Sequence, residues 1–273
     1  MSLLNAVLRR AVDAALSPFA EVSPLVGLGL VSLVVAVGML LVFKRTSNQE
    51  ALESVKRQIQ ACLFEIRLYN DDLRAILGAN AEIMRWNLRY LGLSLVPLAW
   101  MLVPLVLLIA QLEFHYGYRG LGPGEAALVT AELKEAGEAK PAAVLAAPAG
   151  LRVETPSLWV PGDRELAWRI RAERAGRYEL TLTVGGATET KTVVVSEAVV
   201  RRSPVRVSPG FIDQLFYPAE PPLAPASPVR SIEVAYPPRE VEVLGWGLHW
   251  MVVFFVLSIV FAFALRRPLG VTI

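Results

Sequence analysis

The chain has 273 residues, of which 54% are hydrophobic and 19% are charged, whereas a typical soluble domain is about 45–50% apolar and about 25% charged. Its formal net charge is only +2, which gives no indication of specific nucleic-acid binding. The single cysteine, Cys62, excludes an internal disulfide framework and a cysteine-rich metal site.

Residues 1–18 predict an amphipathic helix, because apolar residues recur at helical spacing, with polar residues opposite, until Pro18. Two interpretations stay open. The helix lies in the outer membrane interface, or it packs against an outer domain. No apolar stretch with a cleavage pattern follows Arg9 and Arg10, so we expect the first span to be retained.

The excess of apolar residues is concentrated in three blocks, and His249 is the only ionisable residue in any of them. Blocks of about 20 apolar residues are long enough to cross a bilayer. We therefore predict three transmembrane helices at residues 25–43, 91–112 and 244–265.

Residues 44–90 predict a hairpin of two antiparallel helices with a coiled-coil seam. Apolar residues alternate at steps of three and four in both halves, and polar residues at 70–72 supply the turn. The predicted seam positions are Leu52, Val55, Ile59, Cys62, Ile66 and Tyr69 in the first helix, and Leu73, Ile76, Asn80, Ile83 and Asn87 in the second.

The basic residues predict the orientation. Eight Lys and Arg residues lie in the hairpin, and Arg266 and Arg267 begin the tail at 266–273. Since Lys and Arg in short loops stay cytoplasmic, the hairpin and the C-terminus are predicted inside and the N-terminus outside. We expect the cytoplasmic (inner) membrane of a bacterium.

The second span contains Pro97 and Pro104, which predict a kinked or locally opened helix. Either packing tolerates the bend, or the span lines a groove in which polar groups satisfy the freed carbonyls. The candidate groove or client contacts are Arg85, Asn87, Arg89, Ser94, Pro97 and Pro104.

Aromatic and histidine residues border the spans, where amphipathic rings suit the headgroup region. The predicted interface anchors are Trp86, Tyr90, His115, Tyr116, Trp246, His249 and Trp250. For the two histidines, a paired metal or acid–base site is the alternative.

Residues 113–217 predict an extracytoplasmic all-β domain of sandwich type, because short runs alternate between apolar and polar residues and turn signals separate them. Residues 218–243 contain seven prolines, which predict a stiff, extended return segment to the third span. The expected fold class is thus a membrane α-helical protein with an all-β outer domain.

No nucleophile motif, phosphate-binding loop or metal-ligand spacing is found in the sequence. The expectation is therefore a protein that is not an enzyme and uses no cofactor.

The order of spans, the cytoplasmic hairpin, Lys44-Arg45, residues 84–90 and Pro97 resemble the three-helix core of the YidC/Oxa/Get superfamily of membrane protein insertases. The chain departs from that family in lacking an arginine in the first span and in carrying about 130 residues between the second and third spans.

The resemblance implies an insertase-like protein that assists the insertion or assembly of other membrane proteins. Its partners would be membrane lipids, client proteins and a ribosome at the hairpin. The alternative is a membrane-anchored scaffold subunit of an envelope complex, which binds partners through its outer domain and its hairpin. A transporter is disfavoured because the predicted spans carry no Asp, Glu, Lys or Arg.

Overall fold

The structure is a computed structural model that describes residues 2–69, 71–135 and 137–271. The chain divides into two compact units. The β unit comprises Met1–Gly27 and Leu107–Val252, and the helical unit comprises Leu28–Val106 and Val253–Ile273. The helices are α1 (Ser2–Leu16), η1 (Ser17–Phe19), α2 (Pro24–Thr46), α3 (Gln49–Leu68), α4 (Leu73–Leu112), the π-helical turn η2 (Glu113–Gly117), α5 (Phe211–Phe216) and α6 (Trp250–Leu265).

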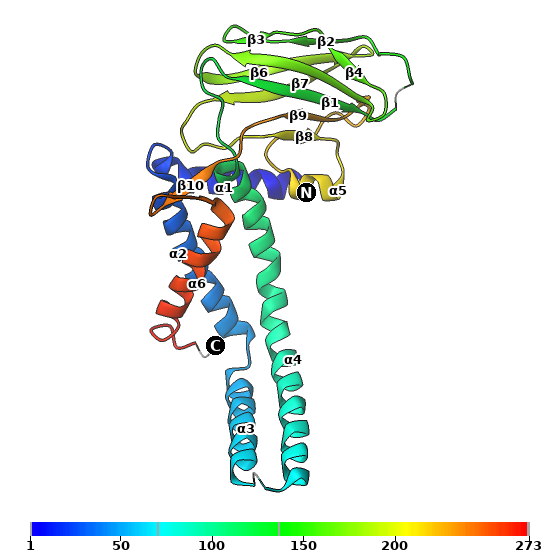
Figure 1. Cartoon of the computed structure of the whole chain (residues 1–273). Coiled ribbons are helices and arrows are strands. Elements are labelled where there is room, and N and C mark those ends of the chain that lie inside the picture. Colours follow the sequence, from blue (N-terminus) through cyan, green and yellow to red (C-terminus); the bar gives the residue numbers. More distant parts are fainter. Residues whose placement is uncertain (1, 70, 136, 272–273) are drawn as a thin grey trace. The chain divides into compact units, whose positions relative to one another are not determined.

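The predicted hairpin is formed by α3 and α4, which lie side by side and antiparallel (Figure 1). Asn48 caps α3 by accepting a hydrogen bond from the backbone N–H of Ala51. Cys62 Sγ lies 3.7 Å from Glu82 Oε2, which joins the middle of α3 to α4. Asn70, in the predicted turn, lies outside the described residues.

The seam of the hairpin is confirmed in α3 at Leu52, Val55 and Cys62, which are buried, but not at Tyr69, which is exposed. In α4 it is wrong at three positions, because Leu73, Asn80 and Asn87 are exposed. Ile76 and Ile83 keep their predicted places, and the residues that precede Asn80 and Asn87 replace these two asparagines, whose polar side chains stay exposed. The buried and half-buried positions in this part of α4 are Ile76, Ala79, Ile83, Trp86 and Tyr90.

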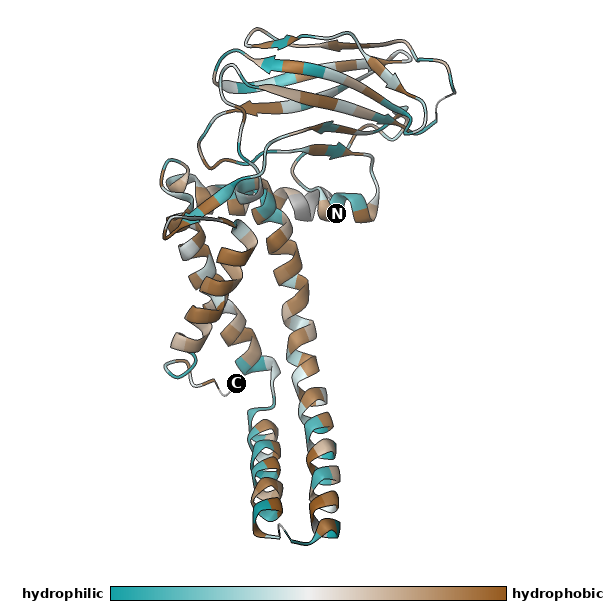
Figure 2. Cartoon of the chain, in the orientation of Figure 1, coloured by the Kyte–Doolittle hydropathy of each residue, from teal (hydrophilic) through white to brown (hydrophobic). Residues whose placement is uncertain are grey.

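Two helices, Pro24–Thr46 and Ile76–Gly117, are long and apolar enough to cross a membrane, and Trp250–Leu265 is a shorter apolar helix (Figure 2). In the helical unit, α2 buries a stripe of residues at four-residue spacing, Leu28, Ser32, Ala36 and Leu40. Ser32 Oγ donates to the carbonyl of Phe254 at 3.4 Å.

The third apolar helix begins at Trp250, not at Leu244 as the sequence predicts. Residues 240–249 instead form a hairpin in which β10 (Glu240–Val243) pairs with β11 (Trp246–His249). Leu244 and Gly245 have φ angles of 53° and 85°, and two consecutive left-handed residues form a tight hairpin turn that a helix cannot include.

The sequence predicts that Pro97 and Pro104 kink the second span or open it locally. In the structure, α4 is a single helix of 40 residues that includes both prolines. Each proline still lacks the N–H that would bond to the carbonyl four residues earlier. The carbonyls of Leu93 and Trp100 therefore lose their usual donors within the helix.

The β unit contains two antiparallel sheets that face each other and a separate β10–β11 hairpin. The larger sheet has the order β3-β5-β1-β9-β8, with β4 also paired to β5, and the smaller has the order β2-β6-β7. The remaining strands are β1 (Ala126–Leu133), β2 (Ala143–Ala146), β3 (Leu151–Val153), β4 (Leu158–Val160), β5 (Glu165–Ala172), β6 (Gly176–Val184), β7 (Ala187–Val195), β8 (Val205–Val207) and β9 (Val229–Val234).

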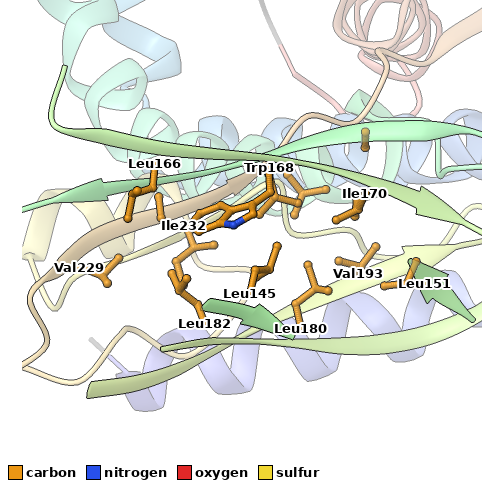
Figure 3. Close-up of a cluster of buried hydrophobic side chains, with 14 of the residues drawn as sticks. Leu145, Leu151, Leu166, Trp168, Ile170, Leu180, Leu182, Val193, Val229 and Ile232 are labelled. Atoms are coloured by element: carbon orange, nitrogen blue, oxygen red, sulfur yellow. The ribbon is translucent and has the colours of Figure 1, made fainter. Parts of the chain in front are cut away.

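The core lies between the two sheets (Figure 3). Leu166, Trp168 and Ile170 of β5 point toward Leu180 and Leu182 of β6, and these side chains are almost completely buried. The alternation of apolar and polar residues seen in the sequence thus places one face of each strand in a shared core.

The sequence predicts that residues 218–243 only form a stiff, extended return to the third span. In the structure, part of this segment belongs to the β domain. Its residues 229–234 form β9, which pairs with both β1 and β8 inside the larger sheet. Val229, Ile232 and Val234 are buried. The β domain therefore continues beyond residue 217, and the prolines flank β9 without interrupting its ladder.

Because Leu166 lies in the core shared by the two sheets, truncation of its side chain should destabilise the β unit. Leu166→Ala should lower the free energy of unfolding of the β unit by about 2–5 kcal/mol, because it leaves a cavity between the sheets. Thermal unfolding of the detergent-solubilised chain, followed by the β-sheet circular dichroism signal, measures this. Val144→Ala, at an exposed position, should change stability by less than about 0.5 kcal/mol, and equal losses would contradict the assignment of the core.

Candidate functional site

The candidate groove residues all belong to α4 but do not gather on one face of it. At 3.6 residues per turn, Pro97 and Pro104 share one face, Arg85 and Arg89 lie on a second, and Asn87 lies with Ser94 on a third. Pro97 is buried and Pro104 is exposed. Ser94 Oγ donates to the carbonyl of Tyr90 at 2.9 Å, so its hydroxyl is satisfied within the helix. The six residues therefore do not line one polar groove.

A different surface of α4 is continuous. Exposed apolar side chains follow one face at steps of three and four residues, with a single longer step at Asn80. We call this surface the α4 stripe; it comprises Leu73, Leu77, Met84, Leu88, Leu91, Leu95, Leu98, Leu102 and Val106.

The α4 stripe extends from the charged hairpin into the apolar part of the helix. Its first residues, such as Leu77 and Leu88, lie between charged residues of the hairpin, and its last lie in a segment without charges. Trp100 and Val103 are also exposed but lie on another face of the helix. The α4 stripe is thus one continuous apolar surface that begins among charged residues and ends in an uncharged segment of α4.

The predicted anchors at the other end of α4 meet in the β unit. Trp250 Nε1 donates to Glu113 Oε2 at 2.9 Å, and the rings of Tyr116 and Trp250 stack with centroids 6.5 Å apart. A Cβ at Gly27 would lie 2.6 Å from the hydroxyl oxygen of Tyr116. The first turns of α2 and α6 and the end of α4 are therefore tied together within the β unit.

The other predicted anchors have different partners. Trp86 lies beside Arg89, whose guanidinium is 5.7 Å from the ring centroid, and Lys56 lies 5.8 Å from the ring of Tyr90. Trp246 is strongly exposed. The ring of His249 lies 6.1 Å from that of Trp250, so the two histidines have separate partners.

His115 is buried and connects η2 to α1 within the β unit. Its Nε2 lies 3.0 Å from Asp13 Oδ1, and its Nδ1 lies 3.3 Å from the carbonyl of Gln111. Both neighbours are acceptors, so both contacts are hydrogen bonds only when both ring nitrogens carry a proton. Arg201 Nε donates to the same carboxylate oxygen at 2.8 Å.

These contacts set the electrostatics of Asp13. Burial alone would raise the pKa of this carboxyl, but hydrogen bonds from His115 and Arg201 hold it below the ordinary value of 3.8. Arg9 also contacts the β unit, since its Nη1 donates to the carbonyl of Ala219 at 3.3 Å. The polar face of α1 therefore packs against the rest of the β unit, as the second sequence interpretation expects.

A second arginine, Arg202, is fully buried beside the π-helical turn. Its guanidinium donates to four backbone carbonyls, and its backbone N–H donates to the carbonyl of Phe114 at 2.7 Å. The burial lowers the pKa of Arg202 to about 10, yet the carbonyl dipoles compensate its charge. The four acceptors are Tyr118, Ser196, Ala198 and Val200.

A cavity of about 650 Å³ adjoins the Asp13 contacts. Its wall combines apolar side chains, including Leu16 and Val199, with the polar side chains of Asp13, His115 and Arg201. In the described part of the chain, no group of three or more His, Cys, Asp or Glu side chains could hold a metal ion.

Sequence reasoning missed Asp13, Arg201 and Arg202. Their partners lie far away in the sequence or are backbone carbonyls, which no spacing reveals. The only local signal is the Arg201-Arg202 pair, and paired arginines are also common on solvated surfaces.

A comparison of the chain with protein families, curated proteins and solved structures finds no match.

The lowered pKa of Asp13 predicts that acid releases α1. A depressed carboxyl pKa stabilises the folded contact above the ordinary value, and that contribution is lost as the pH falls through the lowered value. The distance between spin labels at Val7 and Val144 should therefore broaden between about pH 5 and pH 2.

Asp13→Asn should show a broad distance distribution throughout this range, because it cannot ionise. Asp213→Asn, which changes an exposed carboxylate of α5, should retain the wild-type transition. A wild-type distance that stays narrow at low pH would contradict the role of Asp13.

The Arg202 contacts predict that Arg202→Met destabilises the β unit by about 3–5 kcal/mol, because several buried carbonyls lose their donor at once. The matched control is Arg177→Met, since Arg177 is exposed. Thermal unfolding of both variants in the same detergent compares them, and equal midpoints would refute the structural role of Arg202.

Proposed function

We propose that α2, α4 and α6 cross a bacterial inner membrane, with the α3–α4 hairpin in the cytoplasm and the β unit outside. We further propose that the protein is insertase-like and assists the insertion or assembly of other membrane proteins. The α4 stripe is the observation that carries this proposal.

The stripe has the properties that transfer of an apolar client segment requires. Lipid can cover Leu95 and Leu98 in the apolar part of α4, but it cannot reach Leu77 or Met84 in the charged hairpin. Exposed apolar surface outside lipid costs about 25 cal/mol per Å², which a bound apolar helix of a client would remove. A client bound there then needs only to slide along one face of α4 to reach the hydrocarbon region.

The length of α6 supports the same proposal. Its 16 residues extend over about 24 Å at 1.5 Å per residue, compared with about 30 Å of hydrocarbon in an average bilayer. A short apolar helix is accommodated by local thinning of the bilayer or by flanking side chains that reach the interface. Arg266 and Arg267 follow α6 and can do so. Thinning lowers the cost of moving polar client groups, about 2.5–3.5 kcal/mol per charged residue at the centre of a span.

The second candidate is a scaffold subunit of an envelope complex. The apolar residues around the end of the hairpin favour it, because Leu63, Phe64, Leu68 and Tyr69 of the α3 side are exposed as well. A fixed partner would cover these side chains permanently, whereas a client would cover them transiently.

Photocrosslinking in cells tests the proposal. A photoreactive residue at Leu88 or Leu95 should crosslink to many newly made membrane proteins, and the yield should fall when protein synthesis is stopped. The same residue at Trp100 or Val103, which are equally exposed but off the stripe, should crosslink mainly to lipid. One stoichiometric product that persists without protein synthesis would favour the scaffold, and equal yields at all four positions would refute the stripe.

A further inference from the structure

The β unit exposes large apolar side chains in two places that its core does not use. In the β10–β11 turn, Leu244 is 96% exposed and Trp246 is 73% exposed. In the short helix α5, Phe211 is 65% exposed and Ile212 is 66% exposed, and Phe216 is exposed beside them. Exposed aromatic and branched residues grouped in this way mark an interaction surface.

Leu244 is the most unusual of these residues. Its φ of 53° is left-handed, a conformation that hairpin turns normally give to Asn, Asp or Gly. Leucine at this position is strained, and its side chain has almost no protein contact. A polar turn residue at this position would therefore serve the fold equally well. The exposed leucine side chain points to a partner outside the chain.

Both places lie on the side of the β unit from which the apolar helices emerge. β11 continues directly into α6, and α5 adjoins α1 across a small cavity lined by Ala6, Arg9, Gln214 and Tyr217. Figure 1 shows α1, α5 and β10 on the β8 side of the sandwich, away from β2 and β3. Within the β unit, these elements thus lie on the same side as the first residues of α2 and α6 and the last residues of α4.

α1 presents the same kind of surface. Its residues Arg9 and Asp13 face the β unit, so Val7 and Ala11, which are exposed, lie on the opposite side of the helix. The exposed apolar residues of α1 therefore lie on the side of the helix away from these contacts, whereas Leu16 at its end is buried. In Figure 1, α1 lies between α5 and the β10–β11 hairpin.

We propose that α5 and the β10–β11 turn insert into the outer surface of the bilayer and, with α1 between them, dock the β unit on the membrane. Phe211, Ile212 and Phe216 would lie among the headgroups and upper acyl chains on one flank, and Leu244 and Trp246 on the other. This inference rests on the proposed membrane spans. Trp and Phe in the interface are typical of such contacts.

The charged residues near this surface do not favour an electrostatic contact with the membrane, so the contact depends on apolar side chains. Asp213 lies in α5, and Glu240 and Glu242 lie in β10. With the exposed Arg10 of α1, three carboxylates face one guanidinium on this side. No excess of positive charge attracts anionic lipids, so the occupant that fits is a zwitterionic lipid surface. The docking should persist at high salt, where attraction between charges is screened.

The test uses the full chain with Cys62→Ala, reconstituted in vesicles of phosphatidylcholine. Single cysteines replace Ile212 or Leu244 and carry a fluorophore, and phosphatidylcholine with a nitroxide on its acyl chain acts as the quencher. The matched controls are Val144 and Leu158, which are apolar residues of the β unit that are 65% and 63% exposed. Trp100, 67% exposed on α4, reports on the span itself.

Labels at Ile212 and Leu244 should be quenched at least about threefold more strongly than labels at Val144 and Leu158. This difference should be unchanged in high salt. Quenching at Trp100 without quenching at both Ile212 and Leu244 would overturn the docking and leave the spans intact. Absence of quenching at Trp100 would overturn the proposed spans and, with them, the docking.

Discussion

The guanidinium of Arg202 is the contact on which the arrangement of the β unit depends. A buried charge without a carboxylate partner is tolerated only where dipoles replace water, and four backbone carbonyls do so here. One of them belongs to Tyr118, directly after the π-helical turn, and the others belong to the segment after β7. The same turn carries Glu113, His115 and Tyr116, which reach α6, α1 and α2. The sandwich is thereby connected to the first turns of α2 and α6 and to the end of α4.

The apolar excess of the chain divides into surfaces with different partners. The sandwich core is covered by the protein itself, as the burial of Leu166 and Ile170 shows. We assign the outer surfaces of α2, α4 and α6 to lipid, the exposed side chains of α5 and the β10–β11 turn to the membrane surface, and the hairpin part of the α4 stripe to clients. This division explains why a chain with so many exposed apolar side chains also builds a fully packed β domain.

Local patterns were sufficient for much of the fold and insufficient for the site. Strict alternation in β5 and β6 predicted the sandwich, and the three- and four-residue steps predicted the hairpin. β9 was missed because flanking prolines conceal its apolar positions, and the β10–β11 turn was missed because Leu244 extends an apolar run. The contacts of Asp13 and Arg202 depend on tertiary structure alone. The groove residues were grouped by sequence proximity, whereas the helical period distributes them over three faces of α4.

The placement of the β unit and the hairpin on opposite sides of a membrane is the central claim, and cysteine accessibility tests it most directly. In a Cys62→Ala background, single cysteines at Val144 and Leu63, both exposed, are treated in intact spheroplasts with a reagent that cannot cross membranes. Val144→Cys should react at once, and Leu63→Cys should react only after the membrane is permeabilised. Reaction of both positions before permeabilisation would contradict the proposed topology and the insertase-like function that depends on it.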